Sequence, residues 1–266
     1  MLQWCTLEVS REWHVFVCGA PRSGTTLLKA ILENHSMMCG PTYETTGIFA
    51  NPDFYRDQWW EQTGIQGDEV RTLLAESNSI VSFYDSVAEA VCKKTGSSVF
   101  VDKIPWPPRR HRLWYVTSKF KGAQWVHIVR DGRDCYCSAQ NHPHVPQSSS
   151  ATAFAKYWRT CVESHEAWLP EERTYTVRYE DLTNSPAEVV RTIVDFLGLE
   201  FERRQVEASN RADYDDGAEG AHRRLKKPIS ASSVGRWKTE METSEADAFR
   251  RHAGETLQRF KYEESG

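Results

Sequence analysis

One segment near the N-terminus constrains the fold more than any other. Residues 13–18 (WHVFVC) form a short apolar run rich in β-branched and aromatic residues, which predicts a buried strand. A loop bounded by Gly19 and Gly24 follows, and residues 25–34 then carry leucine and isoleucine at helical spacing. A strand, a glycine loop and a helix in this order indicate the first half of a βαβ unit.

The same alternation continues along the chain. Strands are predicted at 98–102, 124–129 and 174–177, and helices at 79–94, 113–120, 151–168, 186–197 and 244–259. Short apolar strands between helices are typical of a parallel sheet covered on both faces. We therefore expect an α/β protein with a three-layer P-loop fold, a central parallel sheet flanked by helices. Nothing marks a linker, so residues 1–266 are expected to form a single domain.

Composition and charge narrow the classes of function. The net charge of the 266 residues is −4, whereas nucleic-acid binders usually carry a basic excess. No apolar run approaches the ~18 residues of a membrane helix, and the first residues lack a secretory signal. The seven cysteines show no disulfide or zinc-site spacing. We expect a cytoplasmic protein with reduced thiols, no metal, and no nucleic-acid or membrane partner; the oligomeric state stays open.

The glycine loop predicts a phosphate site. Backbone N–H groups in such a turn and at the following helix N-terminus point toward an anion. Position 25 is threonine where the loop of kinases and ATPases has lysine, so a magnesium triphosphate would lack its usual counter-charge. An ordinary strand–turn–helix connection is the alternative. Five consecutive residues that can donate to one anion favour the phosphate site: Arg22, Ser23, Gly24, Thr25 and Thr26.

Two further segments concentrate positive charge. Arg130 directly follows the predicted strand 124–129, and Ser138 lies two turns into the next helix. Both can face one anion, because ligands of parallel sheets bind beyond the carboxyl ends of the strands. A surface Arg–Asp network over residues 130–134 is the alternative. The segment 223–238, the most basic in the chain, is either a flap over a polyanion or a solvated charge run.

Taken together, these segments resemble the P-loop sulfotransferases that use 3′-phosphoadenosine 5′-phosphosulfate (PAPS). The resemblance is greatest to the branch of tyrosylprotein sulfotransferases and their bacterial relatives. Residues 21–28 (PRSGTTLL) match the 5′-phosphosulfate loop of that family. Arg130 followed eight residues later by Ser138 matches its 3′-phosphate motif. The resemblance also implies nucleotide contacts for Tyr179, within VRYEDL, and for Lys227, Arg236 and Trp237 in the C-terminal flap.

The resemblance implies an enzyme that transfers a sulfonate group from PAPS to a hydroxyl or amine by in-line displacement. The acceptor would be a small molecule or peptide, the product 3′,5′-adenosine bisphosphate (PAP), and no metal is implied. Glu44, in residues 39–45 (CGPTYET), falls at the position of the base that takes the acceptor proton. Lys103 falls at the position of the cation that stabilises the leaving phosphate. Alternative bases are His35, His127, His142 and His144.

Some features leave the function open. Relatives carry a serine where this chain has Ala221, and either His222 or Arg223 is a candidate replacement. An aromatic stretch at 43–60 is either a candidate acceptor contact or part of the core. An acidic stretch at 212–219 is either a candidate acceptor contact or a solvated loop.

A P-loop kinase and a non-catalytic nucleotide-binding protein are the alternative functions. The first would need the missing loop lysine, and the second predicts loss of residues such as Lys103, Glu44 or Arg22, all present.

Overall fold

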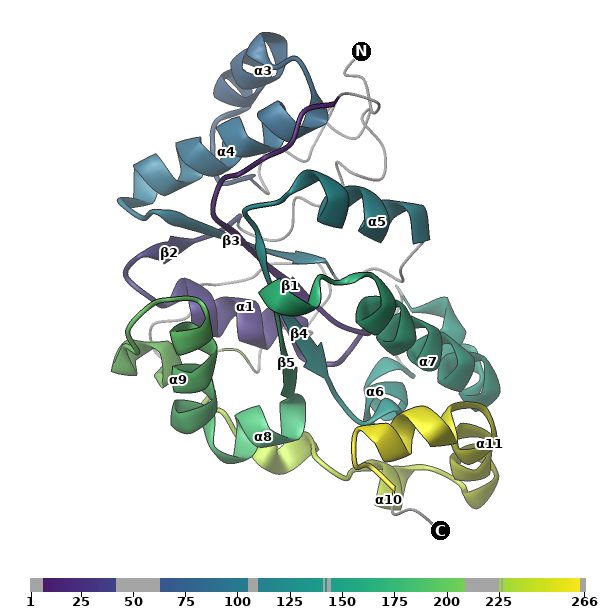
Figure 1. Ribbon diagram of the computed structural model, residues 1–266. Helices are drawn as coiled ribbons and strands as arrows, with labels where there is room; N and C mark the ends of the chain where they lie inside the picture. Colours follow the sequence, from purple (N-terminus) through teal and green to yellow (C-terminus); the bar gives the residue numbers. More distant parts are fainter. Residues whose placement is uncertain are drawn as a thin grey trace.

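The computed structural model describes residues 7–41, 63–104, 110–140, 142, 145–208, 225 and 227–263. Within these ranges a sheet of five parallel strands crosses the molecule in the order β2-β3-β1-β4-β5 (Figure 1). The strands are β1 (His14–Cys18), β2 (Met38–Cys39), β3 (Val99–Ile104), β4 (Gln124–Val129) and β5 (Thr174–Arg178). The predicted α/β class with a central parallel sheet is confirmed.

Both faces of the sheet are buried, and side chains alternate between them along β1. Val15 and Val17 pack toward α1 (Thr25–Glu33) and α9 (Pro186–Phe196). Phe16 and Cys18 pack toward α4 (Ile80–Thr95) and α5 (Arg110–Lys119). This is why the strands read as continuous apolar runs rather than as an apolar–polar alternation.

The remaining helices extend these two layers (Figure 1). α3 (Gly67–Glu76) packs on α4, and α8 (Tyr179–Asn184) follows β5 directly. A third core cluster joins α6 (Gly132–Ala139), α7 (Ala151–Trp168) and α11 (Thr243–Arg259), with α10 (Trp237–Glu240) beside α6. No helix in the described part of the chain is both long and apolar enough to span a bilayer.

The topology determines where a ligand site forms. After β1 the chain turns to α1 on one face, and after β4 it turns to α6 and on to α7, which packs against α5 on the other face. The loops therefore diverge between β1 and β4, at the carboxyl ends of the strands. This divergence is where parallel α/β sheets bind ligands.

Boundaries agree closely where the sequence pattern is long and periodic. β4 and α7 have the predicted limits, and β3 extends two residues past its predicted end to Ile104. The elements that were not predicted include β2, α3, α8 and α10. β2 has only two residues, too few to show a period. α3 buries only Val70, so its apolar stripe is too thin to identify from sequence.

Candidate active site

The loop from Gly19 to Thr26 is folded tightly against its neighbours. A Cβ at Gly19 would overlap the Ile128 carbonyl oxygen and Ser23 Oγ. Gly24 has φ of +102°, and a Cβ there would lie 2.6 Å from Tyr179 Cδ2. Arg22, with φ of +68°, also adopts the left-handed region. A loop this compact brings the backbone close to whatever occupies the cavity in front of it.

The loop leads into the unprotected N-terminus of α1. Gly24 is the N-cap and supplies no side-chain acceptor for the first turn. The first N–H groups of a helix have no intrahelical acceptor, and together they favour an anion. Ser23 is fully buried, and its Oγ has no hydrogen-bond partner among the described residues. The site therefore holds donors suited to an anionic group.

Strand β3 places a cation beside this loop. Lys103 is 3% exposed and lies one residue before the end of β3. Its Nζ donates to Thr26 Oγ1 at 3.1 Å. Lys103 is thus not a solvated strand tip but a buried ammonium at the edge of the loop. Its neighbour Asp102 is also buried and accepts from the Tyr84 hydroxyl at 2.9 Å.

Arg130 lies next to the loop from the other side. Its Nη1 donates to the Arg22 carbonyl at 3.1 Å, and its Nη2 donates to the Ser233 carbonyl at 2.6 Å. The guanidinium stacks on the Tyr179 ring at 4.4 Å. Arg22 Nε in turn donates to Ser138 Oγ at 3.3 Å. The structure therefore brings together the two arginines and the serine that the motifs predicted.

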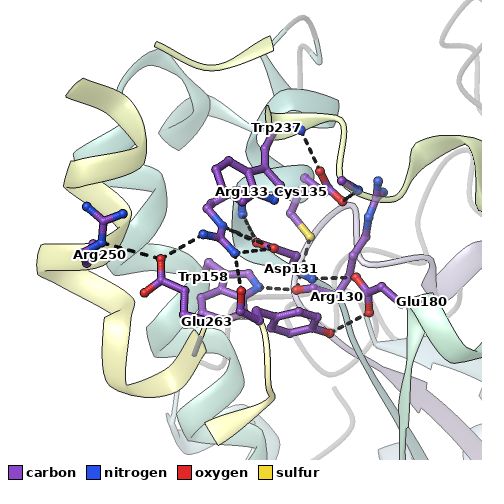
Figure 2. A network of polar contacts seen from close by, with 12 residues as sticks. Arg130, Asp131, Arg133, Cys135, Trp158, Glu180, Trp237, Arg250 and Glu263 are labelled. Atoms are coloured by element: carbon purple, nitrogen blue, oxygen red, sulfur yellow. Dashed lines mark hydrogen bonds and ion pairs between the residues drawn. The ribbon is translucent and has the colours of Figure 1, made fainter. Parts of the chain in front are cut away.

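A buried polar network fixes the backbone around Arg130 (Figure 2). The Asp131 N–H donates to Glu180 Oε1 at 3.1 Å, and Trp158 Nε1 donates to the Arg130 carbonyl at 3.1 Å. Arg133 Nε and Nη2 pair with the Asp131 carboxylate at 3.0 and 2.8 Å. Burial raises the pKa of Glu180, and its bond from the Asp131 N–H opposes that shift. The Arg–Asp network is thus buried and packed behind the site, not on the surface.

Asp134 docks the C-terminal turn onto α6. Its Oδ2 accepts from the Gly235 N–H at 2.7 Å, and its Oδ1 accepts from the Trp237 N–H at 3.0 Å. Burial raises the pKa of this carboxyl, and the two N–H donors oppose that shift. The Trp237 ring stacks under the Arg133 guanidinium at 3.8 Å (Figure 2). Trp237, predicted to contact the nucleotide, is not among the described residues that line the cavity.

A cavity of about 500 Å³ opens over these groups. Nine of the eleven predicted cofactor residues line it: Arg22, Gly24, Thr25, Thr26, Arg130, Ser138, Tyr179, Lys227 and Arg236. The other two, Ser23 and Trp237, lie outside the lining because Ser23 is buried within the loop and Trp237 is held on α6.

Seven uncharged residues that were not predicted as ligand contacts also line the cavity. Further lining residues are Leu27, Leu225, Pro228, Ile229, Ser230, Ser232 and Ser233. Most of them fall between Lys227 and Arg236, so their place within the basic segment was the available signal. Among the described lining residues four carry positive charge and none carries negative charge. Such a lining suits a ligand with more than one anionic group.

None of the predicted bases that the structure describes lines this cavity. Glu44 lies outside the described residues, as do His144, Ala221, His222, Arg223, the aromatic stretch from 43 to 60 and the acidic stretch. His35 is buried, with Nε2 2.8 Å from the Glu200 carbonyl oxygen. His127 is buried in β4, where desolvation holds its pKa well below the usual value. Neither of these, nor His142, lines the cavity.

The described part of the chain holds neither a candidate metal site nor a disulfide. The described residues contain no group of three or more His, Cys, Asp or Glu side chains that could hold a metal ion. The six described cysteines are free and buried, including Cys135 and Cys137. Burial raises the pKa of Cys137 to about 12, which makes that thiol a poor nucleophile.

The chain matches a family model and several curated proteins. A family model described as "Sulfotransferase family" matches residues 14–203. Protein-tyrosine sulfotransferase of Drosophila melanogaster is 23% identical over 250 residues, which cover 84% of this chain and 46% of that protein. Protein-tyrosine sulfotransferase 1 of Danio rerio is 26% identical over 202 residues, 70% of this chain and 53% of that protein. The chain spans about half the length of these two relatives.

Solved structures share the fold at low identity. The sulfotransferase domain of the Synechococcus PCC 7002 olefin synthase superposes with a TM-score of 0.76, at 18% identity and full coverage of both chains. Mouse sulfotransferase SULT7A1 complexed with PAP gives a TM-score of 0.54 at 14% identity, over 94% of this chain and 86% of that chain. These likenesses confirm the predicted architecture.

Proposed function

Because the chain belongs to the sulfotransferase family, as its motifs predicted, we propose that it transfers a sulfonate group from PAPS to an acceptor and releases PAP. The single observation that carries the proposal is one cavity lined both by the glycine loop and by Arg130 with Ser138. PAPS carries a 5′-phosphosulfate and a separate 3′-phosphate, so it needs two anion-binding regions. The solved mouse relative is described as a complex with PAP.

The donor set of the cavity fits this nucleotide. Arg130 Nε is buried and has no hydrogen-bond partner among the described residues. It lies on the guanidinium whose other nitrogens are held by the Arg22 and Ser233 carbonyls. In the proposal the Arg130 region and Ser138 hold the 3′-phosphate, and residues 22–26 hold the 5′-phosphosulfate. Tyr179 packs between the two regions, against Gly24 and under Arg130.

The transfer itself asks the protein mainly to position groups and to stabilise charge. An acceptor oxygen attacks sulfur as the bond to the 5′-phosphate oxygen breaks, so negative charge grows on the departing phosphate. Lys103 Nζ, 3.1 Å from Thr26 Oγ1, would stabilise that charge at the loop. We assign to Glu44 the role of the base that takes the proton from the acceptor. A base on the attacking side completes the displacement.

We propose a tyrosine hydroxyl in a peptide as the acceptor to test first. The curated relatives named above are protein-tyrosine sulfotransferases. A small hydroxyl compound is the second acceptor to test. A kinase function is disfavoured by the missing loop lysine and by Asp102, which bonds to Tyr84 instead of lining the cavity.

The first experiment is calorimetric titration with PAP and with ATP, each in EDTA and in Mg²⁺. We expect PAP to bind with the same affinity in both buffers and ATP to bind weakly. Magnesium-dependent ATP binding without PAP binding would overturn the proposal in favour of a kinase-like site.

The acceptor is tested with ³⁵S-labelled PAPS. We expect label to be transferred to a peptide that contains tyrosine and not to the same peptide with phenylalanine. Label found only on small hydroxyl compounds would replace the peptide acceptor and leave the transfer itself intact. Glu44→Gln is expected to bind PAP normally yet lose turnover, and unchanged turnover would move the base to a histidine.

A further inference from the structure

A fully buried lysine lies on the helix that follows the phosphate loop. Lys29, on α1, is 0% exposed and pairs with Glu33 one turn later, with Nζ 2.5 Å from Oε1. Its Nζ also donates to the Pro41 carbonyl oxygen at 2.8 Å. The ammonium therefore connects α1 to the chain just beyond β2. It plays no part in the transfer chemistry proposed above.

Stability alone does not account for this pair. The charged groups lose hydration when buried, and an apolar side chain of similar volume often stabilises a core equally well. What an apolar side chain lacks is a directed bond. The Lys29 ammonium holds one particular carbonyl oxygen, at Pro41, in one particular place.

The chain leaving β2 is shaped around the carboxylate of this pair. A Cβ at Gly40 would overlap Glu33 Oε1 and the Val101 carbonyl oxygen, so the backbone passes directly over Glu33. One residue earlier, Cys39 Sγ lies 2.7 Å from Cys92 Sγ of α4. The exit of β2 is thus fixed on three successive residues, by contacts with α4, with Glu33 and with Lys29.

The pair also lies within the electrostatic field of Lys103. Burial raises the pKa of Glu33 to about 7, and the Lys29 ammonium opposes that shift. Smaller effects come from Asp102, which raises the pKa, and from Lys103, which lowers it. The four side chains form a cluster of two positive and two negative charges between α1 and β3. Removing either Lys29 or Glu33 leaves an uncompensated charge in the cluster that contains Lys103.

We propose that Lys29 and Glu33 are positioning residues for the transfer reaction. They fix residues 39–41 at the end of β2, and through them the start of the segment that carries Glu44, three residues beyond Pro41. The inference rests on the proposed function, because Glu44 is the base assigned there. It adds a role for two residues that do not line the cavity described above.

The test uses Lys29→Met and Glu33→Gln in the full chain, with Arg159→Met as the matched control. Arg159 forms an i,i+4 pair with Glu163 on α7, but both side chains are more than 40% exposed. Hydrogen–deuterium exchange is followed in peptides covering residues 38–46 and 19–28. PAP affinity is measured by calorimetry. Turnover is measured as the transfer of ³⁵S from PAPS, both to the tyrosine peptide and to water.

We expect faster exchange at 38–46 in both variants and unchanged exchange at 19–28. Turnover is expected to fall by ~10- to 100-fold, the scale of a misplacement near 1 Å, with the PAP dissociation constant within about twofold of wild type. The double variant is expected to lose no more than the worse single variant, because the two residues act as one unit. Arg159→Met should change none of these quantities.

Three results separate the possible failures. If the variants bind PAP but exchange at 38–46 is unchanged, the positioning role is overturned while the proposed function stands. If exchange at 38–46 rises but turnover is unchanged, the pair is an anchor of the fold without a catalytic effect, which also overturns the inference. If wild type itself does not bind PAP, the proposed function fails first.

Discussion

The two regions of the cavity that we propose to bind the anionic groups of PAPS are built in different ways. The glycine loop is one continuous stretch, residues 19–26, whose shape comes from left-handed backbone at Arg22 and Gly24. The Arg130 region gathers parts that are far apart in sequence: Arg130 after β4, Tyr179 at the start of α8 and Ser233 in the C-terminal segment. The first region offers backbone donors, and the second offers charged side chains.

This difference has a consequence for how each region fails. A loop built from backbone geometry is damaged by strain, which lowers both folding stability and binding. A region assembled from side chains is damaged by the loss of one charge or one docking contact. The loss of affinity should then be confined to the part of the ligand that this region holds. PAP and 5′-AMP, which lacks the 3′-phosphate, are therefore the ligands that separate the two regions.

The largest effect is expected for Gly24→Ala. An alanine would have to adopt φ of +102° with its Cβ 2.6 Å from Tyr179 Cδ2. We expect PAP and AMP affinity to fall together by ~100-fold, with a loss of ~1–3 kcal/mol in the free energy of unfolding. Calorimetry and urea unfolding measure both.

A matched control separates backbone strain from lost space. Gly198, after α9, also has positive φ, at +78°, but a Cβ there would meet nothing within 4 Å. Gly198→Ala should cost ~1 kcal/mol of stability and leave PAP affinity unchanged. If Gly24→Ala binds PAP like wild type, the loop is not a strained backbone cradle and the comparison between the two regions fails.

The same contrast explains how much of the site could be predicted from sequence. The glycine loop was predictable because its strand, turn and helix are contiguous. Arg130 with Ser138 was predictable because Arg130 directly follows β4 and Ser138 lies on the next helix, eight residues later. The place of Trp237 outside the cavity lining could not be predicted from sequence, since it depends on the bond between its N–H and Asp134 on α6. Nor could the burial of Lys29 be predicted, because an amphipathic pattern assigns a lysine to the surface. The cytoplasmic location and the single domain over residues 1–266 stay predictions.

Arg130→Ala should damage only the second region. It removes a guanidinium that is 4% exposed and that holds the Arg22 and Ser233 carbonyls. Hydrogen bonds to charged groups contribute ~1.5–3 kcal/mol, so we expect PAP affinity to fall by ~10- to 100-fold. AMP affinity should change by less than ~3-fold if the glycine loop stands on its own backbone geometry. An equal loss for both nucleotides would show that the two regions are one coupled unit.

A smaller effect of the same kind is expected for Asp134→Asn. Asparagine keeps one acceptor for the Gly235 and Trp237 N–H groups, but its amide nitrogen faces the other donor. Losing about one hydrogen bond to a charged group should loosen the turn and weaken PAP binding by ~10-fold, with AMP unchanged. Asp247→Asn, which removes an exposed carboxylate paired with Arg250, is the control. Unchanged PAP affinity would mean that the turn holds its place without Asp134.

The smallest effect is expected at Glu240, and it has the opposite sign. Arg236 lines the cavity, yet its Nε and Nη2 are paired with the Glu240 carboxylate at 2.8 and 2.6 Å. A nucleotide phosphate must compete with that carboxylate for the guanidinium. Glu240→Gln should therefore raise PAP affinity by ~2- to 5-fold at low salt, an effect that screening reduces at high salt because the pair is partly exposed. Weaker PAP binding in this variant would mean that Glu240 aims Arg236 at the ligand, and the second region would then depend on a carboxylate as well as on cations.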